Sequence, residues 1–193
     1  SVNMLSQSKK RVFASSKSEY SLRTLNSIIN SINNNKKIFK NIKLKLIIID
    51  HNSDKKIIQK FKKILKNQFF KSEINQLDIN FYKKKINRIN QQGNKVTNNQ
   101  ISNMSNINQS LNLGKNCDDL VYFVEDDYLH KIDAIEEMLF AYEKISTQTR
   151  KELILCPADY PYLYTNLKNS KILLGNKYHW RTIDESLCTF LTS

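Results

Sequence analysis

The feature that most constrains this fold is an apolar run, residues 120–124, that leads directly into Glu125, Asp126 and Asp127. Such a run, rich in β-branched and aromatic residues, predicts a strand buried on both faces. In open α/β sheets the ligand crevice lies beyond the carboxyl ends of these strands. Three adjacent like charges repel one another, so they favour a divalent cation that bridges to a phosphate. The alternative is a strand that ends in a solvated acidic turn.

Strand and helix patterns alternate along the chain. A second buried-strand pattern runs into Asp50 and the turn-forming residues that follow it. Such alternation predicts an α/β fold with a mostly parallel central sheet and helices on both faces. A predicted hairpin that turns at Gly175 would begin a short antiparallel C-terminal extension. Strands are expected at 2–5, 44–49, 77–82, 120–124, 153–156, 171–174, 178–182 and 187–192, and helices at 21–34, 55–66, 100–113 (capped by Gly114) and 133–145, with loops at 6–20 and 83–99.

Charge is distributed unevenly over the 193 residues, which carry a net charge of +13. Residues 1–116 contain 23 Lys and Arg against 5 Asp and Glu. This half could attract nucleic acid, an anionic membrane surface or phosphorylated ligands, or it could be a solvated lysine surface. The chain lacks an apolar stretch long enough for a transmembrane helix.

The three cysteines, Cys117, Cys156 and Cys188, are an odd and widely spaced set. They form neither a disulfide framework nor a zinc-site pattern. We therefore expect buried thiols in a reducing, cytoplasmic compartment.

Acids at two strand ends, with a basic segment at residues 83–95 between them, indicate phosphate chemistry with a metal. Neither a P-loop nor a Gly-x-Gly-x-x-Gly motif is present, which argues against P-loop and dinucleotide-binding proteins. A nucleotidyltransferase stays an alternative, although the Gly-rich loop that such enzymes carry near the first strand is not visible.

Three segments in order resemble the GT-A-fold glycosyltransferases, family 2-like. They are "SLRTLNSI" at 21–28, "LIIIDHNS" at 46–53 and "YFVEDD" at 122–127. The resemblance implies one GT-A-like domain over 1–193, with a nucleotide-binding half at 1–158 and a partial acceptor-side region at 159–193, truncated at the C-terminus. Two departures are His51, where many relatives have Asp, and Glu-Asp-Asp in place of Asp-x-Asp.

The resemblance also implies roles on the donor side. Asp50 and Asn52 would contact the nucleotide, and Asp127 would bind Mn²⁺ or Mg²⁺ on the diphosphate of a nucleoside-diphosphate sugar. Glu125 and Asp126 would lie beside them, against ribose or sugar hydroxyls. The metal would offset charge that develops on the leaving diphosphate.

On the acceptor side, an inverting enzyme needs a carboxylate that takes the proton from the acceptor hydroxyl. The candidates are Asp184, which we favour, Asp159 and Glu185. His179 could be a further metal ligand, because imidazole suits Mn²⁺. The alternative for His179 is a hydrogen-bonded structural residue beside Trp180.

The expected activity is transfer of a sugar to a glycan, lipid-linked or small-molecule acceptor. The protein would be cytoplasmic, with peripheral contact to the inner face of the membrane through the basic half. The alternative is a basic α/β module that binds nucleic acid or a membrane surface without catalysis. Because the lysines lack an aromatic stacking platform, no nucleic acid is expected as a partner of the enzyme.

Overall fold

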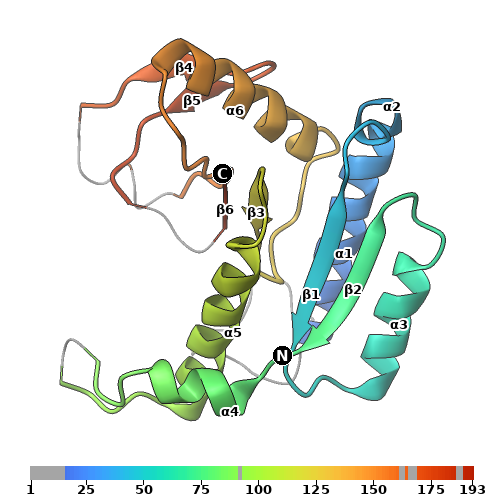
Figure 1. The fold of residues 1–193 in the computed structure, drawn as a ribbon, viewed down its shortest axis with the longest axis vertical. Coiled ribbons are helices and arrows are strands. Elements are labelled where there is room, and N and C mark those ends of the chain that lie inside the picture. Colours follow the sequence, from blue (N-terminus) through green and yellow to red (C-terminus); the bar gives the residue numbers. More distant parts are fainter. Residues whose placement is uncertain (1–15, 91–92, 161–163, 165–168, 186–188) are drawn as a thin grey trace.

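A computed structural model describes residues 16–90, 93–160, 164, 169–185 and 189–193 as a mixed α/β protein (Figure 1). The expected strand at 2–5 lies outside these residues. The helices are α1 (Lys17–Asn34), α2 (Lys36–Phe39), α3 (Lys55–Leu65), α4 (Ile79–Tyr82), α5 (Asn98–Gly114) and α6 (Ala134–Thr149), with a 3-10 turn η1 at Lys83–Lys85. The strands are β1 (Lys45–Asp50), β2 (Lys71–Gln76), β3 (Val121–Phe123), β4 (Ile172–Leu174), β5 (His179–Arg181) and β6 (Phe190–Thr192).

The strands form three two-stranded sheets. β1 and β2 are parallel, with Asp50 opposite Gln76 at their carboxyl ends. β3 pairs antiparallel with β6, and β4 with β5, so the antiparallel C-terminal strands are confirmed. A single, mostly parallel central sheet is not found within the described residues. Residues 153–156, expected as a strand, contribute only a bridge from Leu155 to Leu191.

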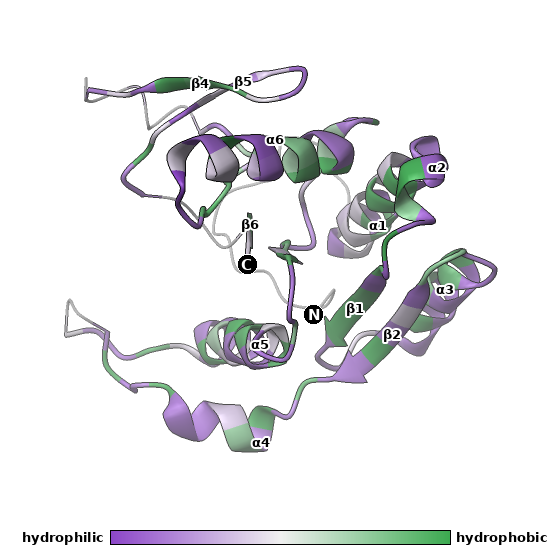
Figure 2. Ribbon diagram, turned by 45° about the horizontal axis from the view of Figure 1, so that its top comes forward, coloured by the Kyte–Doolittle hydropathy of each residue, from purple (hydrophilic) through white to green (hydrophobic). Residues whose placement is uncertain are grey.

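The main core lies between α1, α6 and the β1–β2 pair. Figure 2 shows β1 hydrophobic over most of its length, next to the more mixed β2. On α6, Met138 and Ile145 are each only 1% exposed, so the second half of the chain closes onto the first. The helical spacing of apolar residues places these side chains on one face of each helix. The buried apolar residues of α1 and α6 are Leu25, Ile28, Ile29, Ile32, Ile135, Met138, Ala141, Tyr142 and Ile145.

Capping side chains set where the helices begin. The hydroxyl of Ser16 accepts a hydrogen bond from Glu19 N at 3.4 Å, so α1 begins at Lys17. The expectation of a loop was therefore wrong for residues 17–20. Asp54 caps α3, accepting from Lys56 N at 2.7 Å.

Helix α5 differs from its expected bounds at both ends. A capping box between Thr97 and Gln100 starts it at Asn98. Gly114, expected as its C-cap, is instead its last helical residue. A Cβ on Gly114 would lie 2.7 Å from Cζ of Phe123, so a close approach to β3 accounts for this glycine.

The strand expected at 77–82 was wrong. Asp78 accepts from Phe81 N at 3.0 Å, and this cap starts the short helix α4. Leu77 N donates to the Asp50 carbonyl at 2.7 Å, so the chain leaves the β1–β2 pair at that point. The strand that the structure shows is β2, just before residue 77. Its sequence is polar, and Ile74 is the residue of β2 that packs on the main core.

Candidate functional site

The segment 124–133 between β3 and α6 carries the three expected carboxylates, and we call it the acid loop. Its start is fixed from the C-terminal strand: Glu125 N donates to the hydroxyl of Thr189 at 3.2 Å, and Thr189 is fully buried. Farther along, the hydroxyls of Tyr128 and Tyr160 hydrogen-bond to each other. The acid loop therefore lies against residues from both candidate halves of the chain.

Helix α1 runs along the acid loop and holds it by polar contacts. Ser21 donates to Asp126 Oδ2 at 2.9 Å, and Lys17 Nζ lies 3.5 Å from Oδ1. The next two contacts are His130 N to Ser27 Oγ at 3.0 Å and Ile135 N to Ser31 Oγ at 3.1 Å. The last is Asn35 Nδ2 to Glu136 Oε2 at 3.1 Å. We call this series of contacts the α1 seam.

His130, which lies between β3 and α6, is neutral in this seam. The hydroxyl of Ser27 donates to the Thr24 carbonyl at 2.8 Å, so it accepts from His130 Nδ1 at 3.3 Å. Nε2 of His130 then accepts from the Tyr122 hydroxyl at 2.8 Å. Burial lowers the pKa of His130, outweighing its bond to the backbone of Tyr128, and burial raises the pKa of Tyr122. The neutral tautomer ties β3 to α1.

The electrostatics of the acid loop centre on Glu125. Burial raises its pKa above the ordinary value of 4.5, and the charges of Asp127 and Asp126 raise it further. Lys17 acts in the opposite direction but does not cancel them. The repulsion expected from three adjacent carboxylates is thus present, and a bound cation would relieve it.

Replacing Glu125→Gln is expected to raise the melting temperature near neutral pH by roughly 1–3 °C. Because the pKa of Glu125 is higher in the folded chain, the folded state binds more protons between the unfolded and folded pKa values. Stability therefore falls as pH rises through that window, and Gln removes the cost. The gain should vanish at about pH 4, below the unfolded pKa. Calorimetry at both pH values, with the exposed Asp118→Asn as control, tests this; a lower melting temperature at neutral pH would contradict it.

Asp50 closes the turn after β1. It is only 4% exposed, and its Oδ2 accepts from Ser53 N at 3.2 Å and from Gln76 Nε2 at 3.0 Å. A nucleotide contact would have to use its other oxygen. Asn52 follows in the left-handed region at φ 56°, which Asn tolerates well, and its side chain is exposed.

The acceptor-side candidates lie on two segments. Asp159 is bonded by Arg181 Nη2 at 2.8 Å and by the hydroxyl of Tyr164. Partial burial acts to raise the pKa of Asp159, but these two bonds and the Arg181 charge outweigh it and lower the pKa. Asp184 and Glu185 are exposed after β5. Asp159 is the neighbour of Tyr160, whose hydroxyl hydrogen-bonds to Tyr128 of the acid loop.

His179 is exposed on β5, opposite Leu174 of β4. Its neighbour Trp180 donates from Nε1 to Glu137 Oε1 at 3.0 Å, so the hairpin is fastened to α6 at this point. No group of three or more His, Cys, Asp or Glu side chains that could hold a metal occurs within the described part of the chain. His179 as a metal ligand stays a prediction.

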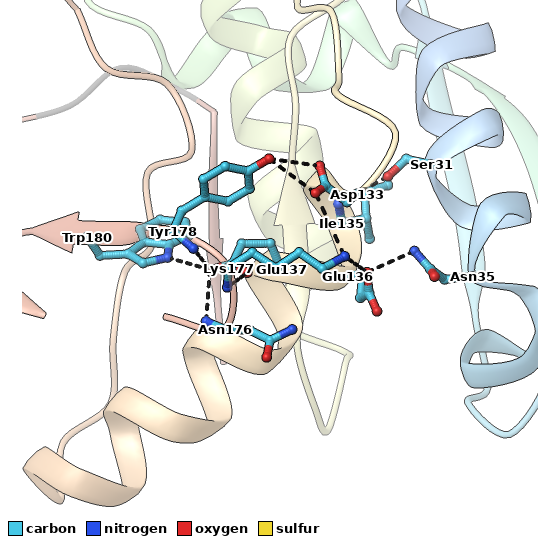
Figure 3. A network of polar contacts seen from close by, with 10 residues as sticks. All are labelled: Ser31, Asn35, Asp133, Ile135, Glu136, Glu137, Asn176, Lys177, Tyr178 and Trp180. Carbon is cyan, nitrogen blue, oxygen red and sulfur yellow. Dashed lines mark hydrogen bonds and ion pairs between the residues drawn. The ribbon is translucent and has the colours of Figure 1, made fainter. Parts of the chain in front are cut away.

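Glu137 was not among the predicted site residues, yet it holds together part of the polar network in Figure 3. Its carboxylate is 2% exposed and accepts from the backbone N–H groups of Asn176 at 3.0 Å, Lys177 at 2.7 Å and Tyr178 at 3.4 Å. The bond from Trp180 completes the set. We call these contacts the hairpin clamp. A Glu on the buried face of an amphipathic helix was the available signal.

Of the expected buried thiols, Cys117 is exposed, which corrects that prediction, and Cys156 is half-buried; both are free. Cys188 lies outside the described residues. Nor does any helix in the described ranges combine the length and apolar character needed to cross a membrane.

Comparisons with known proteins add no family assignment. No protein-family model, curated protein or solved structure matches the chain.

Proposed function

We propose that this chain is a GT-A-like glycosyltransferase that moves a sugar from a nucleoside-diphosphate donor to an acceptor hydroxyl. The observation that carries the proposal is the acid loop. Three carboxylates follow β3, and the pKa of Glu125 is raised by burial and by its two acidic neighbours. Repulsion between these carboxylates destabilises the fold, so binding of a cation together with its anionic ligand would stabilise it.

The donor set suits Mn²⁺ or Mg²⁺ bound together with a diphosphate. Mg²⁺ sites commonly use one or two carboxylates, with substrate phosphates and water supplying the other oxygens. A cluster of three protein ligands is therefore not required. Asp127 would hold the metal, and the bound metal would offset negative charge on the diphosphate leaving group.

The chain's own residues would orient the donor. Ser21 and Lys17 fix Asp126, so its carboxylate is presented in one position for a ribose or sugar hydroxyl. Asp50 and Asn52 would contact the nucleotide from the turn after β1. Glu125 would lie beside the sugar, where its carboxylate could accept a hydrogen bond from a hydroxyl.

A base must take the proton from the acceptor hydroxyl. Asp159 is weakened for this role, because Tyr164 and Arg181 help to lower its pKa and thus its basicity. Asp184, exposed just after β5, is the better candidate, with Glu185 beside it. In this assignment Asp159 instead orients Arg181 at the junction with the acid loop.

The proposal includes a GT-A-type arrangement in which 1–158 binds the nucleotide and 159–193 forms part of the acceptor side. The hydrogen bond between the hydroxyls of Tyr128 and Tyr160 supports a site that both regions share. We place the reaction in the cytoplasm, because the free thiols of Cys117 and Cys156 suit a reducing compartment. The acceptor would be a glycan, a lipid-linked sugar or a small molecule.

A thermal-shift screen tests this function. Mn²⁺ with the matching nucleoside diphosphate is expected to raise the melting temperature by about 5–10 °C at saturating ligand. Asp127→Asn should abolish the Mn²⁺-dependent part of the shift, because it removes charge and keeps shape. The control Asp118→Asn, exposed before β3, should leave the shift intact. If no nucleoside diphosphate shifts the transition, or if Asp127→Asn shifts as fully as the parent chain, the proposal fails.

A further inference from the structure

One end of the β1–β2 pair is rich in lysines. Residues 33–49 and 60–72 contain ten Lys and no Asp, Glu or Arg. They come from α2, the starts of β1 and β2, and the second half of α3. We call this surface the lysine end. Its exposed lysines are Lys36, Lys37, Lys40, Lys43, Lys45, Lys60, Lys62, Lys63, Lys66 and Lys71.

The two segments form one continuous surface. Asn33 Nδ2 donates to Gln68 Oε1 at 3.2 Å, which joins the end of α1 to the turn before β2. The Nζ atom of Lys36 lies 5.4 Å from the centre of the half-buried Phe69 ring. Figure 1 shows α2 and the end of α3 at the same end of the strand pair. The positive charges therefore add up on one side of the molecule.

This charge is largely uncompensated by the protein. Within the described chain, Lys45 is the one lysine of the ten that forms an ion pair, with Glu73 at 2.9 Å. Glu136, which accepts from Asn35 Nδ2 at 3.1 Å, pairs with Lys177 at 2.7 Å and not with a lysine of this surface. Among the described residues, nine of these lysines thus have no carboxylate partner, and such a surface is complementary to a dense array of phosphates.

An apolar component lies among these lysines. Ile42 is 43% exposed between Lys40 and Lys43, in the link from α2 to β1. A shallow hollow of about 350 Å³ opens nearby on α3 and β2. Its lining combines two ammonium groups, a hydroxyl and apolar side chains: Lys62, Leu65, Lys66, Ser72 and Ile74. Lysines that surround an exposed aliphatic side chain suit the boundary between lipid headgroups and acyl chains.

We propose that the lysine end docks on an anionic phospholipid bilayer, with the ammonium groups on headgroup phosphates and Ile42 inserted at the acyl boundary. A nucleic acid is the less fitting partner, because this surface has no Arg for bidentate contacts to bases or phosphates. Nor do the described residues offer an exposed aromatic platform here: Phe39, Phe61 and Phe70 are buried, and Phe69 lies under Lys36.

Docking in this way leaves the acid loop open to water. Asp126 accepts from Ser21 near the start of α1, and the lysine end begins at residue 33, twelve residues further along, so about 18 Å of helix separate them. The inference does not depend on the proposed function, since a bilayer contact could serve any soluble ligand at the acid loop. Its test is likewise separate from the thermal-shift test.

Vesicle co-sedimentation tests the docking surface. The chain is expected to bind phosphatidylcholine vesicles that contain about one-third phosphatidylglycerol, to bind pure phosphatidylcholine weakly, and to dissociate as salt rises. The variant Lys37→Gln, Lys40→Gln, Lys43→Gln should weaken vesicle binding about 100-fold, at roughly fivefold per lysine. Ile42→Gln should weaken it by about threefold to tenfold.

The matched control is Lys84→Gln, Lys95→Gln, Lys115→Gln, which removes the same charge from exposed positions outside the lysine end. It should change vesicle binding by less than about threefold. Equal losses in both triple variants would overturn the proposal, because total charge alone would then explain binding. It would also be overturned by absent vesicle binding, by an unchanged affinity of Ile42→Gln, or by tighter binding to a single-stranded oligonucleotide at the same salt.

Discussion

Replacing Glu137→Ala is expected to lower the free energy of unfolding by about 3 kcal/mol, or the melting temperature by roughly 9 °C. The carboxylate is 2% exposed, and both of its oxygens accept hydrogen bonds from the β4–β5 hairpin. Its removal leaves the backbone N–H groups of Asn176 and Lys177 and the indole N–H of Trp180 without that acceptor. Each unsatisfied buried donor costs about 1–3 kcal/mol, partly recovered where water can enter.

The matched control is Glu143→Ala, which removes an exposed carboxylate from the same helix and should cost less than about 0.5 kcal/mol. Glu137→Gln should fall between the two, because the amide keeps one acceptor and turns an N–H group toward the hairpin donors. Urea unfolding followed by circular dichroism measures all three. A loss below about 1 kcal/mol in Glu137→Ala would show that the hairpin clamp is not a stabilising contact.

Gly175→Ala is expected to destabilise the fold by about 2–3 kcal/mol for a steric reason. A Cβ at this position would overlap the Glu137 carboxylate and lie 2.5 Å from Trp180 Nε1. The methyl group would thus push apart the two side chains whose bond fastens the hairpin. Gly93→Ala is the control: no atom lies within 4 Å of its Cβ position, so its cost of about 1 kcal/mol comes from the φ of +80° alone.

The double variant Glu137→Ala, Gly175→Ala separates the clash from the backbone effect. With the carboxylate gone, one of the two clashes disappears and the Trp180 indole is no longer held by its bond to Glu137, so the two costs should sum to at least about 1 kcal/mol more than the cost of the double variant. Strict additivity in urea unfolding would mean that the methyl group does not act through Glu137. The expected coupling would locate the strain between these two residues.

Local patterns in the sequence predicted the elements whose causes are local. Helix α3 follows from apolar spacing and the Asp54 cap, and the β4–β5 hairpin follows from the turn at Gly175. Strand β2 could not be predicted in this way. Its polar residues become a strand because β1 lies alongside in parallel register, and nothing in the six residues Lys71–Gln76 records that neighbour.

The same distinction applies to the candidate site. The sequence places three carboxylates after a strand, and the structure puts the acid loop there. The sequence alone does not show that Ser21 and Lys17 hold Asp126, or that the hydroxyls of Tyr128 and Tyr160 meet, because these partners are far apart along the chain. Glu137 was overlooked for a related reason: its acceptor role exists only once the hairpin has packed on α6.

The α1 seam has a consequence for synthesis. The partners in its hydrogen bonds are separated by 101 to 105 positions: Ser21 with Asp126, Ser27 with His130, Ser31 with Ile135, and Asn35 with Glu136. A ribosome makes α1 first, so this helix must wait exposed until some hundred further residues have left the exit tunnel. Contacts of such separation form slowly, because a long loop must close before they contribute. The acid loop therefore acquires its geometry late, and a nascent chain halted before Glu136 would present α1 to chaperones without its seam partners complete.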